Sequence, residues 1–193
     1  HMIEAARFLV RSEQRERWNA ARAGGVTATL VSNAATPAGF RTALAHLGIP
    51  DVHVEGNPYF DFGNEQEVEM MQWAHSEHSI LANSWLIAGE NPLHMATPDG
   101  LNLTHDLIAE CKTTGTDWVT IPAKYRRQIQ WQLHVTGAER CLFVWQLRLP
   151  DGDYFRPAWW EPKHLWVDRD EQQIAELVEV AERLMETDNE YRY

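Results

Sequence analysis

The sequence has no long apolar run and only two cysteines, and these scarcities set the first limits. No stretch approaches the roughly 18 apolar residues of a membrane span, and no basic stretch followed by an apolar one resembles a secretory signal. Cys111 and Cys141 are too few for a disulfide framework or for the four thiolates of a structural zinc or iron–sulfur cluster. We therefore expect a cytoplasmic protein with two buried free thiols.

Positive charge is also scarce. The 17 Lys and Arg residues stand against 28 Asp and Glu residues, which gives a formal net charge of -11. This balance argues against a protein that coats nucleic acid with a uniformly basic surface. It is compatible with a local basic groove, because phosphate contacts act within about one Debye length, roughly 8 to 10 Å.

The length and composition suit one compact domain. The chain has 193 residues, 44% of them hydrophobic, which is enough to bury a core. We interpret His1 as the remnant of an expression tag and expect a single domain over residues 2–193. We find no internal repeat, linker or low-complexity segment that would divide it.

Apolar periodicity and turn formers predict a mixed order of helices and strands. Helices are expected at residues 12–23, 36–48, 64–76 and 123–135, and over a late amphipathic stripe from Ile174 to Met185 that Asp168 and Asp170 can cap. Strands are expected at residues 80–88, 93–97, 107–112 and 142–149, with turn formers over 50–62. The helix at 123–135 should cross from the third strand to the fourth. The pattern predicts an α/β (α+β) fold with a central mixed β-sheet flanked by helices.

The residues that carry chemistry are Pro98-Asp99-Gly100, followed by Glu110-Cys111-Lys112. Alternate side chains of a strand share a face, so Glu110 and Lys112 should project together while Cys111 points the other way. Asp99, in the preceding turn, can converge on them. Hydrolysis of a phosphodiester needs hard oxygen ligands for Mg²⁺ and a positive group near the attacking water or the phosphate. The spacing alone is a weak signal, since charged residues at strand ends are usually solvated.

The surrounding blocks of sequence strengthen this interpretation. They are, in chain order, Trp18, Arg22, residues 25–29, residues 63–67, Pro98 to Leu101, Glu110 to Lys112, and Tyr125 to Gln130. This order resembles the YqaJ-like viral recombinase family, the lambda-exonuclease-like nucleases, over about residues 18–137. The resemblance implies the PD-(D/E)xK nuclease fold, in which a β-sheet is flanked by helices and binds one or two Mg²⁺ ions.

The resemblance also implies a set of metal ligands. Asp99 and Glu110 would bind the metal directly, with the main-chain carbonyl of Cys111 as a further ligand. Glu67, four residues after Gly63, would be a helix-borne acid close to the metal. Without that glycine spacing, Glu67 would be interpreted as an ordinary surface residue.

Further roles follow from the same resemblance. Lys112 would orient or deprotonate the attacking water, and Gln128 would position that water or the scissile phosphate, although it could instead face solvent. Arg22 and Thr29 would form a terminal-phosphate pocket, since a guanidinium grips phosphate in a bidentate way while a hydroxyl donates beside it. On residue type alone, an ordinary helix-terminal Arg and a turn Thr explain these two equally well.

The sequence departs from the family pattern just after the Glu-x-Lys motif. Lambda-exonuclease-like relatives carry an arginine there, whereas residues 113–116 are Thr-Thr-Gly-Thr. Either these hydroxyls or a basic residue among Lys124, Arg126 and Arg127 would have to contact the 5′ phosphate. The departure puts strict dependence on that phosphate in question.

The implied function is a Mg²⁺-dependent exodeoxyribonuclease, with Mn²⁺ as a substitute metal. It would degrade linear double-stranded DNA from its ends, 5′ to 3′, and leave 3′ single strands for phage-type homologous recombination. A trimeric ring around the DNA, a single-strand annealing partner and a phage or prophage origin in a bacterial cytoplasm are implied as well. Two alternatives stay open: a structure-specific or single-strand endonuclease of the same fold, and a catalytically inactive DNA-binding or assembly protein.

Two other groups of residues attract less weight. His75 and His78 are three residues apart on an expected helix, but spacing places no third His or Cys beside them. Trp159, Trp160 and Trp166 could stack on bases. Because the chain has nine tryptophans, we interpret these three as core or subunit contacts.

Overall fold

The structure, a computed structural model, describes residues 1–49 and 56–191. A six-stranded mixed sheet has the order β2-β5-β6-β7-β8, with β9 also paired to β7, and a three-stranded sheet has the order β1-β3-β4. The elements are η1 (Ala5–Arg7), β1 (Phe8–Arg11), α1 (Arg15–Ala23), α2 (Ala28–Ala34), α3 (Pro37–His46), α4 (Pro58–His78), β2 (Ile80–Ala82), β3 (Trp85–Ala88), β4 (Met95–Ala96), β5 (Gly100–Asn102), β6 (Leu107–Thr114), α5 (Ala123–Thr136), β7 (Arg140–Asp151), β8 (Tyr154–Pro157), β9 (Lys163–Asp168) and α6 (Glu171–Tyr191). The predicted α/β class, a mixed sheet flanked by helices, is confirmed.

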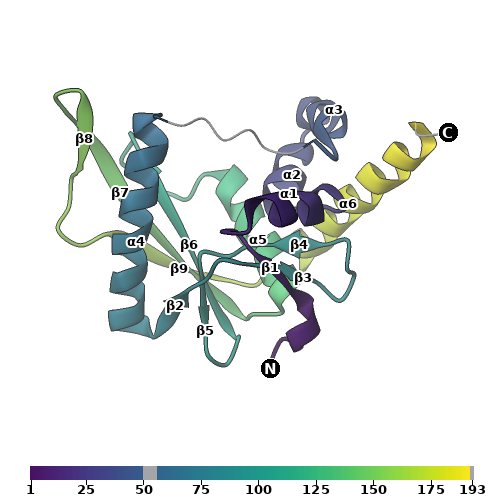
Figure 1. Cartoon of the computed structure of the whole chain (residues 1–193), viewed down its shortest axis with the longest axis horizontal. Helices are drawn as coiled ribbons and strands as arrows, with labels where there is room; N and C mark the ends of the chain where they lie inside the picture. The colour runs from purple at the N-terminus through teal and green to yellow at the C-terminus, as the bar shows by residue number, and fades with distance from the viewer. Residues whose placement is uncertain (50–55, 192–193) are drawn as a thin grey trace.

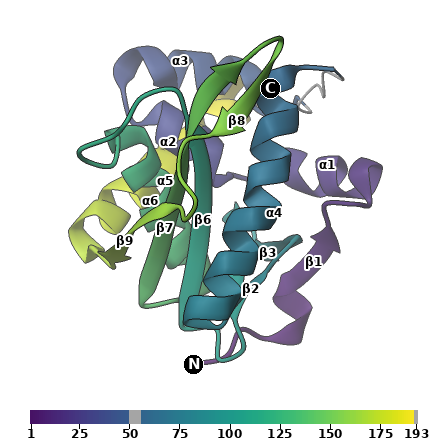
Figure 2. The ribbon, with the colours of Figure 1, turned by 90° about the vertical axis from the view of Figure 1, so that its left-hand side faces the viewer.

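The larger sheet lies between two layers of helices. Figure 1 shows α4 beside the β7-β8 hairpin at one side of the molecule, with α1, α2, α3 and α6 gathered at the other. Viewed from the left-hand side of Figure 1, α4 crosses in front of β6 and α5 lies behind the strands (Figure 2). Apolar side chains alternate accordingly: Ala109 and Cys111 pack in the cluster that faces α4, whereas Ile108 and Phe143 pack in the cluster with α5.

The connection from β6 through α5 to β7 is the centre of the fold. The two strands pair in parallel from Leu107 opposite Arg140 to Thr114 opposite Leu147, and α5 joins them, as predicted. Helix α5 ends at Gly137, whose backbone has φ 74°, a left-handed conformation that glycine adopts at low cost. This crossover places the residues of α5 above the face of β6 that carries Glu110.

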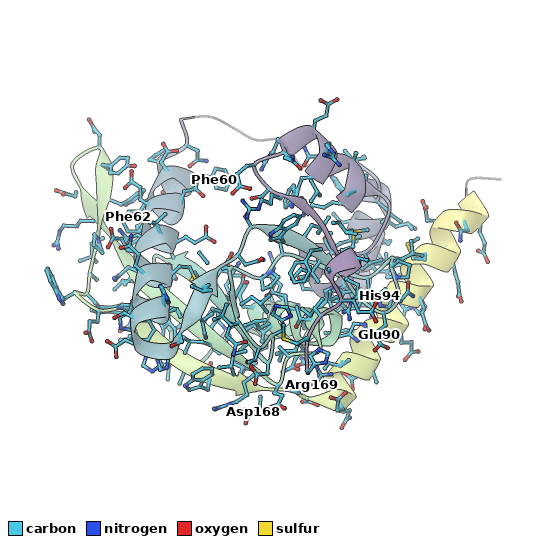
Figure 3. The ribbon with its side chains drawn as sticks, turned by 60° about the horizontal axis from the view of Figure 1, so that its bottom comes forward. Phe60, Phe62, Glu90, His94, Asp168 and Arg169 are labelled. Atoms are coloured by element: carbon cyan, nitrogen blue, oxygen red, sulfur yellow. The ribbon has the colours of Figure 1, made fainter. Side chains whose placement is uncertain are left out.

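Helix α4 begins earlier than predicted. The turn formers over 50–62 indicated an irregular segment, but the helix starts at Pro58, after the Asn57 side chain accepts a hydrogen bond from Tyr59 N at 2.9 Å. The prediction is wrong for residues 58–62, and residues 50–55 lie outside the described part of the chain. Phe62, labelled in Figure 3, is buried. Its ring lies 5.9 Å from the Phe155 ring, and this tertiary contact favours the helix.

The predicted strand at 80–88 is two strands in different sheets. The chain turns at Asn83, whose side-chain amide donates to the carbonyls of Trp85 at 3.1 Å and Pro98 at 2.8 Å. The other predicted strands correspond to β4, β6 and β7, whereas β1, β5, β8, β9 and the short helix α2 were not predicted. Asp170 caps α6 by accepting hydrogen bonds from Gln172 N and Gln173 N, but Asp168 is the last residue of β9.

Two expectations about composition can be compared with the structure directly. Cys111 and Cys141 are both free thiols and both buried, as predicted. Across residues 1–49 and 56–191, none of the helices combines the length and apolar character that crossing a bilayer would require.

Candidate active site

Four ionisable side chains meet at the edge of β5 and β6. Lys112 Nζ lies 2.8 Å from Glu110 Oε1, on the face of β6 opposite to the one that carries Cys111. Asp99 Oδ2 accepts a hydrogen bond of 2.7 Å from Cys111 N. In addition to burial, Glu67 of α4 raises the pKa of Asp99, which places its carboxyl close to that of Asp99. The structure therefore brings Asp99, Glu110, Lys112 and Glu67 together.

Gly100 is what allows Asp99 to approach β6. Strand β5 pairs with β6 through Gly100 opposite Ala109. A Cβ atom at residue 100 would lie 2.5 Å from Met71 Cε and 2.9 Å from Ala109 Cβ. Only glycine lets α4, β5 and β6 pack this closely. Because residue 100 has no side chain, the preceding Asp99 can place its carboxylate beside β6.

Burial and mutual repulsion shift the proton affinities of the acids upward. Burial raises the pKa of Asp99, and the hydrogen bond and the charge of Glu67 raise it further. Burial, followed by the charge of Asp99, raises the pKa of Glu110 to about 7. Burial lowers the pKa of Lys112, but the carboxylates of Glu110 and Asp99 raise it by more, so the net shift is upward. The single ammonium group of Lys112 thus lies beside several carboxylates. An added cation would further stabilise the charged forms of these acids.

The cluster opens into a cavity of about 250 Å³. Its wall includes Asp99, Glu110, Lys112, Arg22, Thr29, Gln128 and Gln132. Three buried polar atoms on this wall have no hydrogen-bond partner among the described residues: Trp18 Nε1, Thr97 Oγ1 and Gln132 Oε1. Because an unpaired buried polar group costs about 1–3 kcal/mol, the cavity is suited to a polar ligand.

Two neighbours of the cluster were not predicted as site residues. Gln132 Nε2 donates to Glu110 Oε2 at 2.8 Å and holds the carboxylate from α5. The Tyr125 ring lies 5.0 Å from Lys112 Nζ. Gln132 follows the predicted site residue Gln128 by four positions, so a search for residues on the same helix face could have found it. Gln128 is itself buried and lines the cavity.

The residues expected to bind a terminal phosphate lie farther along the same cavity. Arg22, at the end of α1, stacks over Trp18 with its Cζ atom 4.1 Å from the ring centroid, and Thr29 lies in the first turn of α2. Of the three basic residues considered beside them, Arg127 lines an adjoining cavity that also contains Arg22, whereas Lys124 and Arg126 line neither of these two cavities. Of these three basic residues, Arg127 therefore lies nearest to the cavity that Arg22 lines.

The donor set fits a hard divalent cation. Carboxylate oxygens are the ligands that Mg²⁺ prefers, and Glu67, Asp99 and Glu110 supply them. No group of three or more His, Cys, Asp or Glu side chains within the described ranges is already arranged as a metal site. The fit therefore depends on the chemistry of the donors and on the raised pKa values of Asp99 and Glu110, and not on a preformed cage.

The residues given less weight lie away from this cluster. The His78 ring packs 5.4 Å from the Trp73 ring and 5.3 Å from the Trp166 ring. Trp159 and Trp166 are half-buried, but Trp160 is fully exposed and does not belong to the core of this chain, so the prediction of a subunit contact is left for Trp160. Glu65 and Glu69, the neighbours of Glu67 in sequence, are exposed.

Comparison with known proteins gives matches of structure and none of sequence. No protein-family model matches the chain, and the search of curated protein sequences found no match. The alkaline exonuclease LHK-Exo from Laribacter hongkongensis is 25% identical, with a TM-score of 0.73 over 91% of this chain and 93% of that chain. LHK-Exo in complex with dAMP has a TM-score of 0.74 at 24% identity, again over 91% of this chain and 93% of that chain. A phage-related exonuclease from Haemophilus somnus 129PT has a TM-score of 0.65 at 14% identity over 86% of this chain and 94% of that chain. The chain therefore has the fold of these exonucleases, which supports its resemblance to lambda-exonuclease-like nucleases.

Proposed function

We propose that the protein is a Mg²⁺-dependent exodeoxyribonuclease that degrades linear duplex DNA from its 5′ ends. The likeness to an alkaline exonuclease over nine tenths of both chains supports the enzyme class, a deoxyribonuclease that acts as an exonuclease. The observation that carries the proposal is the convergence of Asp99, Glu110 and Lys112 on one buried cavity.

The acids of the cluster would hold the metal. Asp99, Glu110 and Glu67 would supply carboxylate oxygens, the main-chain carbonyl of Cys111 would add a further ligand, and Mn²⁺ would substitute for Mg²⁺. A bound ion of this kind polarises a phosphoryl oxygen and lowers the pKa of its water. The upward pKa shifts of Asp99 and Glu110 support this role, because a divalent cation stabilises the charged forms that burial disfavours.

The other residues of the cavity would position the reactants. Lys112 keeps its proton beside Glu110 and the Tyr125 ring, so its ammonium group would orient the attacking water or the phosphate. Gln128 would donate a hydrogen bond to the water or to the scissile phosphate. Gln132 would hold Glu110 in place through its hydrogen bond of 2.8 Å.

The direction of degradation follows from where a terminal phosphate would be anchored. Arg22 and Thr29 share the cavity with the acids. An end held there by its 5′ phosphate would present the next phosphodiester to Asp99 and Glu110, and a 3′ single strand would be left. We extend the proposal to a single domain over residues 2–193, a trimeric ring, a single-strand annealing partner and a phage or prophage origin in a bacterial cytoplasm. The resemblance and the phage-related neighbour support this extension.

The test is a degradation assay on end-labelled linear duplex, with and without a 5′ phosphate, in Mg²⁺ and in EDTA. We expect mononucleotides from the 5′ end in Mg²⁺ and none in EDTA. The variant Lys112→Ala should be inactive, and the matched variant Lys163→Ala, which changes an exposed lysine paired with Asp117, should be fully active.

Two alternatives would show themselves in the same experiment. Nicking of covalently closed plasmid in Mg²⁺ would favour an endonuclease of this fold. Duplex binding with no Mg²⁺-stimulated release of nucleotides would favour an inactive DNA-binding or assembly protein. The complete acid and lysine cluster argues against the second alternative.

A further inference from the structure

A second and larger cavity adjoins the candidate active site. Its volume is about 730 Å³, and it lies among α1, α2 and α3 with Arg127 of α5 on its wall. It shares Arg22, Thr27 and Thr29 with the cavity that contains the acids, so the two spaces meet at the residues proposed to anchor a terminal phosphate. The volume lies within the roughly 300–1,000 Å³ that small-molecule sites occupy.

The larger cavity is suited to an anion. Its wall carries Arg22, Arg127 and His46, and none of the lining residues within the described ranges 1–49 and 56–191 is Asp or Glu. Arginine presents several donors in a fixed plane that matches the oxygens of phosphate. In a chain with a net charge of -11, two arginines beside the active site favour a negatively charged ligand in this cavity.

Two polar side chains on the wall are suited to bind a ligand. Arg127 Nε donates to Ser32 O at 2.9 Å, which fixes the guanidinium against α2. Asn19 Oδ1 is buried and has no hydrogen-bond partner among residues 1–49 and 56–191. Since a buried amide oxygen without a partner is costly, Asn19 is suited to accept a hydrogen bond from a ligand.

The far end of the cavity depends on close packing between α2 and α3. A Cβ atom at Gly39 would lie 1.8 Å from the backbone oxygen of Asn33, so a side chain there would force the two helices apart. Leu30 and Ala43 add apolar surface to the wall. A sugar and a base could lie on this surface while a phosphate meets the arginines.

We infer that this cavity receives the released nucleotide, a nucleoside 5′-monophosphate, after each cleavage. The inference rests on the proposed function. In that reaction the water oxygen bonds to phosphorus and the P–O3′ bond breaks, while the water proton balances the leaving 3′ oxygen. The remaining strand gains a new 5′ phosphate, and the released nucleotide keeps its own 5′ phosphate and a 3′ hydroxyl.

The geometry of the two cavities fits this sequence of events. The phosphate of the released nucleotide starts at Arg22 and Thr29, where the two cavities meet. Movement toward Arg127 takes it away from the acids and clears the anchor for the new terminal phosphate. The larger cavity therefore allows the strand to advance without the product passing back over the acids.

The test is binding of thymidine 5′-monophosphate to the full chain in EDTA, measured by calorimetry. A catalytic metal cannot hold the nucleotide under this condition, so binding reports the arginine-lined cavity. We expect a dissociation constant below roughly 1 mM, weaker binding at higher salt, and no measurable binding of thymidine, which lacks the phosphate.

Two variants that add negative charge inside the cavity keep the test independent of any one variant. Asn33→Asp and His46→Glu, both on its wall, should each weaken the affinity about tenfold. The matched change Asn189→Asp, at an exposed residue of α6, should leave it unaltered. Equal affinity in all four proteins, or binding that needs Mg²⁺, would overturn the inference. Failure of the nuclease proposal would appear separately, as undegraded duplex in Mg²⁺.

Discussion

Helix α5 contributes to two buried clusters of ionisable residues whose proton affinities shift in opposite senses. On one side, Gln132 contacts Glu110 in the acid cluster, where the pKa values of Asp99 and Glu110 are raised. On the other, His134 Nε2 lies 3.0 Å from His94 Nδ1. Burial, followed by the charge of His134, lowers the pKa of His94 to about 4.

The two clusters differ in how completely their polar groups are paired. The histidine pair is enclosed, with Asn91 Nδ2 3.4 Å from His94 Nε2 and the Trp131 ring 4.8 Å from the His94 ring. Figure 3 labels His94 and Glu90 close to α6. The acid cluster instead faces a cavity whose wall keeps unpaired polar atoms. Burial neutralises the histidines and stabilises one closed arrangement, whereas it leaves the acids in need of a cation. The difference supports the proposal that the acid cluster is the reactive one.

The largest effect on activity is expected from variants that remove the charged groups of the acid cluster. Lys112→Ala and Asp99→Asn should each lower the rate of duplex degradation by roughly 10³-fold or more, because residues that act as a unit fail together. Circular dichroism should show that the fold is retained. Full activity in either purified variant would refute the site.

The histidine pair should affect stability and leave chemistry unchanged. The pKa of His94 is about 4 in the folded chain and near 6.5 in the unfolded chain. Between these two pH values the unfolded chain binds a proton at His94 that the folded chain does not. Stability should therefore fall as the pH is lowered from about 7 to 4, by on the order of 2 kcal/mol from His94. Burial, followed by the charge of Arg169, lowers the pKa of the partner His134, which Glu171 and Glu90 raise in part.

Urea denaturation at several pH values would measure that contribution. His94→Gln should flatten the acid side of the stability profile, while His164→Gln, a change at an exposed histidine of β9, should leave it as in the wild type. A parallel profile for His94→Gln and wild type would show that the pair does not titrate as described.

The smallest effect is expected where α5 supports the acid cluster. Gln132→Leu removes the hydrogen bond to Glu110 and should raise the Mg²⁺ concentration for half-maximal activity about tenfold. Gln130→Leu is the matched control, because buried Gln130 instead bonds Asp168 O and Asp170 N at the start of α6. That control should lower stability with no change in Mg²⁺ dependence. An identical Mg²⁺ requirement in Gln132→Leu and wild type would count against the positioning role.

Much of the helical framework could be predicted because local signals agree with tertiary packing. Thr36 caps α3 by accepting from Gly39 N at 3.1 Å, and α5 follows Pro122 and ends at Gly137. The edge strands β8 and β9 carry mostly exposed residues, so their sequences lack the apolar alternation that marks a strand. Helix α2 is only seven residues long, too short to show a period.

The part of the site that lies on strand β6 could be predicted from the sequence. The alternation of Glu110 and Lys112 follows from the period of β6, and the turn before Gly100 allows Asp99 to join them. The contacts of Gln132 and Arg127 depend instead on the rotation of α5 above the sheet. Sequence does not specify that rotation, so Lys124, Arg126 and Arg127 were equivalent until the fold was known.

Metal binding to the purified chain, followed by calorimetry and by thermal unfolding, tests the account most directly. Wild type should bind Mg²⁺ or Mn²⁺ and gain about 2.7 kcal/mol of stability at a metal concentration of 100 times the dissociation constant. The double variant Asp99→Asn, Glu110→Gln should show neither binding nor stabilisation, and His94→Gln should show both. Equal metal binding by wild type and the double variant would contradict the claim that these buried acids form the metal site.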